Sequence, residues 1–306
     1  MILCCHWEIR DRREGDDMEI GIIGAGKVGC SMGKYMTEHG QELAGFYSRS
    51  ARSSEEAGTF TGTKAYEDLK TIVAACDLLF VAVPDDRIGD VWQEICGLPL
   101  SLEGKILCHF SGSLSSAVFS GIEDMGAFAC SIHPMSAFSD KFTSYQQLKD
   151  VTLTMEGSER ATPIVGALFA DMGNTVLTIA PETKGLYHCS ASLVSNFMIG
   201  LYEMGLDLLK QCGIGEEDAR GLTTPLVKNN IQTMLENGTA AALTGPIERG
   251  DVKTVEKHLE ALGESVEGNV YRDLGQYVLQ VAERKNPDRE YGEIEKVLSD
   301  RNGDRV

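Results

Sequence analysis

The segment Ile20-Gly21-Ile22-Ile23-Gly24-Ala25-Gly26-Lys27-Val28-Gly29 decides the fold of this chain. Its apolar start predicts a buried strand over 20–23, and residues 30–39, which follow it, have a helical pattern. The three glycines between strand and helix permit a tight turn, a close approach of the backbone to a pyrophosphate, and close helix packing. We therefore expect a dinucleotide to bind at Gly24, Ala25, Gly26, Lys27, Val28 and Gly29. The alternative is a glycine turn that binds no ligand.

The end of the second predicted strand, over 43–47, indicates which dinucleotide binds. An NAD site has Asp or Glu there to accept hydrogen bonds from the ribose, whereas this chain has Ser48-Arg49-Ser50, followed by Arg52. An arginine flanked by hydroxyls binds a 2′-phosphate through charge-assisted hydrogen bonds. We predict NADP as the cofactor, in contact with Ser48, Arg49 and Ser50. The alternative is that Arg49 and Arg52 are solvated loop charges.

Short apolar runs alternate with helical patterns as far as residue 180. The further strand candidates lie at 78–83, 106–110, 127–132, 151–155 and 175–179. This alternation predicts an α/β fold with a doubly wound, mainly parallel sheet of the Rossmann type over residues 18–180. Helical patterns then take over, at 184–212, 217–237 and 252–281, and predict an all-helical C-terminal domain over 181–306.

Two loops at the carboxyl ends of predicted strands carry further candidates. Ligands bind at these ends in a doubly wound sheet, so the loops should face the nicotinamide ribose, and Ser111 the substrate as well. The alternative for Asp85 and Asp86 is to cap the following helix. The cofactor-binding candidates in the two loops are Val83, Pro84, Asp85, Ser111 and Gly112.

A polar stripe marks the start of the helical half. At about 100° per residue, Lys184, His188, Ser192, Ser195 and Asn196 fall on one side of a helix whose other side is apolar. This stripe is a candidate catalytic face, with His188 or Lys184 as proton donor and with Ser192 and Asn196 beside the substrate. The alternatives are a solvated face and, for His188, an interior histidine without a chemical role.

Composition narrows the partners. The net charge of −18 and the absence of a long basic run argue against nucleic acid and membrane surfaces. The nine cysteines are scattered without Cys-x-x-Cys spacing, and the histidines show no metal-ligand spacing, so we predict no metal. No signal peptide is evident, and we expect a cytoplasmic protein. Residues 1–17, charged and aperiodic, are interpreted as a disordered extension or as the result of a start assigned too early.

The chain resembles Rossmann-like proteins whose C-terminal half is the domain of unknown function 2520. The resemblance extends from about residue 18 to 282 and rests on the glycine loop and four further motifs. It implies an NADP-dependent oxidoreductase of unassigned substrate, similar to pyrroline-5-carboxylate reductases and β-hydroxyacid dehydrogenases, and a homodimer formed through the helical domain. The motifs are Val83-Pro-Asp-Asp86, His109-x-Ser-Gly112, Ser131-Ile-His-Pro134 and Leu243-Thr-Gly-Pro-Ile-Glu-Arg-Gly-Asp251.

The same resemblance assigns roles but leaves the donor open. His188 falls where the dehydrogenases have a catalytic lysine and Ser192 where they have an asparagine, while Lys184 precedes His188 by one turn.

Arg249 is expected to bind a substrate carboxylate, or else to brace its loop through Asp251, and His133 is a further substrate-binding candidate. The expected reaction is hydride transfer between NADP(H) and a small carbonyl, imine or hydroxy acid. The alternative is a non-catalytic NADP-binding or redox-sensing protein, whose Lys184 and His188 would point to water.

Overall fold

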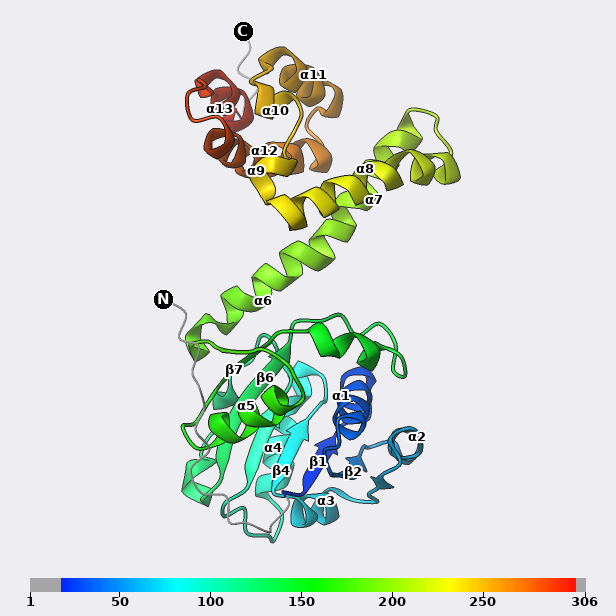
Figure 1. The fold of residues 1–306 in the computed structure, drawn as a ribbon, viewed down its shortest axis with the longest axis vertical. Coiled ribbons are helices and arrows are strands. Elements are labelled where there is room, and N and C mark those ends of the chain that lie inside the picture. The colour runs from blue at the N-terminus through cyan, green and yellow to red at the C-terminus, as the bar shows by residue number, and fades with distance from the viewer. Residues whose placement is uncertain (1–17, 301–306) are drawn as a thin grey trace. The chain divides into compact units, whose positions relative to one another are not determined.

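The computed structural model describes residues 18–300. The chain divides into two compact units, the first ending at Ser195 and the second beginning at Asn196 (Figure 1). This division lies later than residue 180, where the sequence changes texture, because the helix that begins at Lys184 is bonded to the sheet of the first unit. The extension expected over residues 1–17 lies outside the described residues.

Among the described residues, eight strands form one sheet, with the spatial order β3-β2-β1-β4-β5-β6-β7-β8. Neighbouring strands are parallel except for β6 and β7, which are antiparallel. The predicted doubly wound, mainly parallel sheet is confirmed. The strands are β1 (Ile20–Ile23), β2 (Leu43–Tyr47), β3 (Lys64–Ala65), β4 (Leu78–Val81), β5 (Ile106–His109), β6 (Phe128–Pro134), β7 (Leu153–Gly157) and β8 (Val176–Thr178).

Helices cover both faces of this sheet because successive strand side chains point to opposite sides. In β4, Phe80 belongs to a hydrophobic cluster with residues of α1 and α5, whereas Leu79 and Val81 belong to a second cluster with residues of α3 and α4. The α-helices of the first unit are α1 (Lys27–Glu38), α2 (Ala51–Thr61), α3 (Leu69–Ala75), α4 (Asp85–Cys96), α5 (Ala161–Asp171) and α6 (Lys184–Ser192). Short 3-10 turns lie at Ser116–Val118, Glu123–Met125, Ser144–Asp150 and Pro181–Thr183.

The second unit is helical, as predicted for the C-terminal part of the chain. A π-helix, Leu193–Phe197, crosses the division between the two units. Buried residues of α10 to α13 form the core of the second unit, among them Ile247, Val255, Leu279 and Ile294. The helices are α7 (Met198–Gln211), α8 (Glu216–Asn237), α9 (Thr239–Ala242), α10 (Pro246–Arg249), α11 (Val252–Leu262), α12 (Val266–Lys285) and α13 (Gly292–Ser299).

The pattern over 252–281, expected as one helix, is two. Gly263 ends α11 with a φ of 58°, which favours glycine, and the side chain of Ser265 caps α12 by accepting a hydrogen bond from Gly268 N. Across residues 18–300, no helix combines the length and apolar character needed to cross a membrane.

Candidate functional site

The glycine loop connects β1 to α1 at the carboxyl edge of the parallel strands. Gly24 has a φ of 111° and donates its N–H to the carbonyl of Tyr47 (2.7 Å). A Cβ atom added at Gly24 would clash with the carbonyl of Ala82. Gly29 packs against the carbonyl of Gly24 in the same way. A Cβ atom on Gly26, by contrast, would meet nothing within 4 Å. Gly24 and Gly29 therefore shape the loop, and Gly26 leaves open space at the start of α1.

A cleft of about 160 Å³ adjoins this loop. Arg87, one of its charged residues, is paired with Asp90 at 3.0 Å, whereas Arg49 makes no ion pair within residues 18–300. No carboxylate stands at the end of β2. The lining includes Gly24, Ala25, Gly26, Ser48, Arg49, Val83, Pro84, Arg87 and Glu94.

Three other predicted cofactor residues take different places. Ser50 caps α2, its hydroxyl accepting from Ser53 N at 3.3 Å, and Lys27 and Val28 form the first turn of α1. Arg52, which the sequence analysis placed beside Arg49, is bonded to Glu56 (2.9 Å), and Glu56 also accepts from Lys141 (3.1 Å). Of the two arginines that the sequence offers after β2, Arg49 is thus the one that lines the cleft.

Asp85 links the segment after β4 to the loop after β5. It is the first residue of α4, and its Oδ2 accepts hydrogen bonds from the hydroxyls of Ser111 (2.8 Å) and Ser113 (2.6 Å) in the loop after β5. The side-chain cap proposed as its alternative role is not made, because the cap position belongs to Pro84. Asp85 and Ser111 therefore form one polar group at the edge where the cleft lies.

Gly112 lies at the meeting point of two imidazoles. A Cβ atom on Gly112 would stand 2.6 Å from Nδ1 of His188 and 2.8 Å from Nε2 of His133, and the two ring centroids are 5.9 Å apart. Nδ1 of His188 is buried and has no hydrogen-bond partner among the described residues. The hydroxyl of Tyr187, which the sequence analysis missed, is 2.8 Å from Nδ1 of His133. Two predicted site residues, far apart in sequence, thus come together at a third.

Two histidines of this region, His133 and His109, are neutral at pH 7. Burial and the nearby Lys184 ammonium lower the pKa of His133 to about 4. The same two causes lower the pKa of His109 to about 4. Because Nδ1 of His109 accepts from Ser111 N (3.2 Å), its Nε2 carries the proton and donates to the carbonyl of Ser115 (3.2 Å).

Lys184, the first residue of α6, points into the protein and is 2% exposed. Its Nζ donates to the carbonyl of Ser111 (2.8 Å) and to the hydroxyl of Ser131, and lies 4.0 Å from Oε1 of Glu156. Burial lowers the pKa of Lys184, while Glu156 opposes this shift. Glu156, on β7, is a buried charge that the sequence analysis did not identify.

Of the remaining candidates, one lies on α6 and two belong to the second unit. Ser192, half-buried, ends α6, and Asn196 belongs to the second unit. Arg249 also belongs to the second unit, where it is exposed at the end of α10. The alternative brace through Asp251 is not formed by hydrogen bonds, because the Asp251 carboxylate caps α11 through Thr254 N (3.2 Å) and its hydroxyl (2.7 Å).

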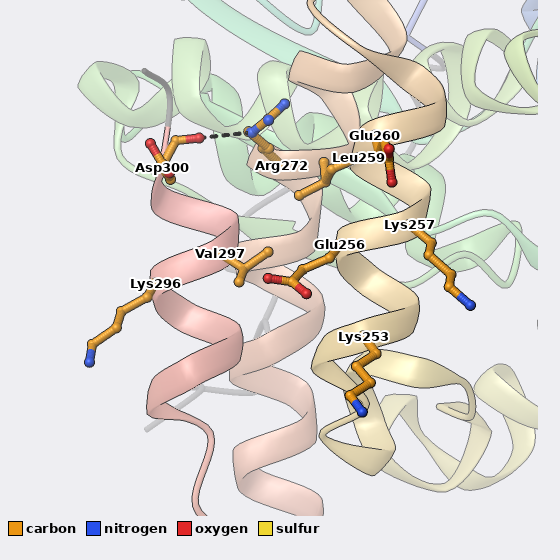
Figure 2. Close-up of a pocket in the computed structure, with 9 residues that line it drawn as sticks. All are labelled: Lys253, Glu256, Lys257, Leu259, Glu260, Arg272, Lys296, Val297 and Asp300. Atoms are coloured by element: carbon orange, nitrogen blue, oxygen red, sulfur yellow. Dashed lines mark hydrogen bonds between the residues drawn. The ribbon is translucent and has the colours of Figure 1, made fainter. Parts of the chain in front are cut away.

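A second hollow lies on the helical unit, between α11, α12 and α13 (Figure 2). Its side chains carry charges of both signs, and Lys257 and Lys296 extend away from its centre in Figure 2. Arg272 is engaged with the carbonyl of Asp300 (3.0 Å). This open surface of mixed charge is not arranged to bind a particular ligand. Within residues 18–300, no group of three or more His, Cys, Asp or Glu is arranged to hold a metal ion.

Comparison with protein families accounts for both parts of the chain. Residues 8–134 match a Rossmann-like domain, and residues 151–278 match the domain of unknown function DUF2520. The chain combines a Rossmann-like domain with DUF2520. DUF2520 begins ahead of β7 and so contains Glu156, Lys184 and His188, whereas the Rossmann-like domain contains Gly112 and His133. The group around Gly112 is therefore built by both domains.

Solved structures share the fold of this Rossmann–DUF2520 chain. Protein TM1727 from Thermotoga maritima is 25% identical, with 87% of this chain and 99% of that chain covered and a TM-score of 0.70. A reductive aminase from Aspergillus terreus, in complex with NADPH and ethyl-5-oxohexanoate, is 16% identical (92% and 98% covered, TM-score 0.61). The Plasmodium falciparum pyrroline carboxylate reductase with NADP bound is 13% identical (89% and 98% covered, TM-score 0.55). None of the curated protein sequences matches this chain.

Proposed function

We propose that this chain is an NADP-dependent oxidoreductase that transfers hydride between NADP(H) and a small carbonyl, imine or hydroxy acid. The observation that carries the proposal is the convergence of His133 and His188 on Gly112, in a loop that follows β5 as the cleft loops follow β1, β2 and β4. Two proteins with this fold, the reductive aminase and the pyrroline carboxylate reductase, bind NADPH and NADP.

The residues of the cleft fit NADP. The first turn of α1 has no side-chain cap, so its amides are free for a pyrophosphate, and Gly26 leaves room for it. Arg49 lines the cleft without an ion-pair partner in the described part of the chain, and supplies a cation for the 2′-phosphate. Ser48 adds a hydroxyl beside it.

Bound NADPH supplies a hydride to the carbon of the C=O or C=N group. His188 donates the proton that the oxygen or nitrogen takes up, since an imidazole is the side chain that most often transfers protons in enzymes. Buried polar atoms are normally hydrogen-bonded, so a ligand is expected to provide the partner that Nδ1 of His188 lacks. Ser111 and His133 contact the substrate or the nicotinamide ribose, and Ser192 contacts the substrate. Asn196 and Arg249 are further proposed substrate ligands, Arg249 for an acidic group.

The side-chain orientations of Lys184 and His188 support the interpretation of the protein as an enzyme rather than as a sensor. A non-catalytic NADP-binding or redox-sensing protein needs no proton donor near the nicotinamide, and both side chains would then be free to face water. Instead, Lys184 is buried and the ring of His188 contacts Gly112.

The test is to titrate NADPH and NADH against the purified protein and then to screen imines and 2- or 3-oxo acids for NADPH oxidation. With a substrate in hand, His188→Gln should retain NADPH binding but reduce turnover by at least about 100-fold. Cys189→Ser, an exposed neighbour on α6, is the control. Failure of NADPH to bind, or full turnover by His188→Gln, overturns the proposal.

We further propose a homodimer formed through the helical domain. Large apolar side chains are exposed on α7 and α8, including Ile199 (66%), Leu226 (62%) and Leu235 (75%). Monomeric proteins rarely expose large apolar patches, and a second copy of the same helices supplies a matching apolar partner for these side chains.

A further inference from the structure

A buried ion pair, Lys184 and Glu156, adjoins the loop that contains Gly112. Lys184 and Glu156 are each 2% exposed, and neither lines the cleft. Taking two charges out of water is costly, and apolar residues of similar size often stabilise a fold equally well. The pair therefore indicates a role that apolar packing would not perform.

The hydrogen bonds of this pair are directed at one loop. Lys184 Nζ and the hydroxyl of Ser131 both donate to the carbonyl of Ser111. Glu156 accepts from the backbone N–H and the hydroxyl of Ser116, each at 2.8 Å. The loop from Ser111 to Ser116, which contains Gly112, is thus held at both ends by Lys184 and Glu156.

His188, whose ring contacts Gly112, lies on the same helix as Lys184. Lys184 and His188 are four residues apart in α6 and therefore lie on one face of the helix. Fixing the ammonium of Lys184 against the Ser111 carbonyl consequently fixes the ring of His188 relative to Gly112.

We infer that Lys184 is a positioning residue, which with Glu156 holds the Ser111–Ser116 loop so that Gly112 lies against His133 and His188. Lys184 is not the group that donates a proton to substrate. The catalytic consequence rests on the proposed function, but the geometry does not. The titratable groups that interact electrostatically with Lys184 are Glu156 from β7, Asp85 from α4, Cys108 and His109 from β5, and Cys130 and His133 from β6.

The experiment uses the full chain with Lys184→Met and with the double change Lys184→Met and Glu156→Gln. The single variant leaves Glu156 buried without a cation and is expected to lose stability, whereas the double variant removes both charges and keeps the fold testable. Lys105→Met is the matched control, because Lys105 Nζ also donates to a backbone carbonyl, that of Cys76 (2.6 Å), but just ahead of the amino end of β5.

Two readouts apply to the double variant. Hydrogen exchange over residues 111–116 should be at least about tenfold faster than in the wild type. The pKa of His133, followed by NMR, should rise from about 4 because the Lys184 cation is gone. Lys105→Met should change neither. An unchanged result in either readout, or an equal change in Lys105→Met, overturns the inference. NADPH binding, measured on the same samples, tests the proposed function separately.

Discussion

Nδ1 of His188 stands 2.6 Å from the point that a Cβ atom on Gly112 would occupy, and no side chain fits between them. The backbone of the loop after β5 is therefore in direct contact with the second turn of α6. Gly112 belongs to the Rossmann-like domain and His188 to DUF2520, so this contact joins the two domains at the proposed reaction centre.

Gly112→Ala should separate the two imidazoles from the loop. The new methyl group would displace both rings, and we expect turnover to fall by at least about tenfold, since small displacements of reacting groups are costly. Gly185→Ala is the control, because a Cβ there meets nothing within 4 Å and should stabilise α6 slightly. Turnover by Gly112→Ala equal to that of the wild type would contradict the assigned contact.

Gly26→Ala should weaken cofactor binding without destabilising the fold. Its Cβ has open space in the protein, so the melting temperature should hold, while NADPH affinity should fall at least about tenfold because the methyl group occupies the place of the pyrophosphate. Gly24→Ala, strained at a φ of 111° and blocked by Ala82, should lower both. Calorimetry and NADPH titration distinguish the two variants, and unaltered affinity in Gly26→Ala would exclude the site.

Arg49→Ala should weaken NADPH binding by about tenfold to 100-fold, the worth of a charge-assisted hydrogen bond, and leave NADH binding unchanged. Arg52→Ala is the comparison, since Arg52 is already paired with Glu56 and its side chain is 87% exposed. Titration of both nucleotides measures the effect. A larger loss from Arg52→Ala than from Arg49→Ala would reassign the phosphate contact.

The free energy of unfolding should fall as the pH is lowered from about 6.5 to 4. The pKa values of His109 and His133 are lowered from 6.5 to about 4 in the folded protein, so only the unfolded chain binds these protons in that window. For His109, which is fully buried, the loss reaches about 3 kcal/mol. Urea unfolding at several pH values measures this free energy. Its dependence on pH should be flatter in His109→Gln than in the wild type, and the same as in the wild type in His258→Gln, an exposed control. Identical curves would refute the assignment.

Leu226→Glu should convert the proposed dimer to a monomer, because it places a charge among the exposed apolar side chains of α8. Light scattering after size-exclusion chromatography measures the mass. Ile164→Glu, on α5 and 37% exposed, should leave the mass unchanged. A wild-type protein that is monomeric at all concentrations would disprove the dimer.

The sheet was largely predictable because its strands are short apolar runs. β1 and β2 begin and end at the predicted residues. β3 was missed, since Lys64 and Ala65 are both exposed and carry no apolar signal. The antiparallel direction of β7 was not predictable either, because the alternation of side chains along a strand does not depend on its direction.

The polar stripe was predictable only as far as α6 continues. The helical wheel assumed α-helical geometry through Asn196, but the π-helix that starts at Leu193 has more residues per turn and moves Ser195 and Asn196 out of register. Glu156 went unnoticed because a charged residue in an alternating strand looks the same whether it faces water or a buried partner. Only the fold brings it to Lys184.

The burial of Lys184 against Glu156 limits how the chain can be cut. A fragment ending at residue 180 would keep Glu156 on β7 without its cation, and a fragment starting at residue 151 would take β7 and β8 and leave β6 as a bare sheet edge. The two sequence domains are therefore not interchangeable modules. Chimeras between relatives need to exchange the loop after β5 together with α6 and β7, as one co-adapted set.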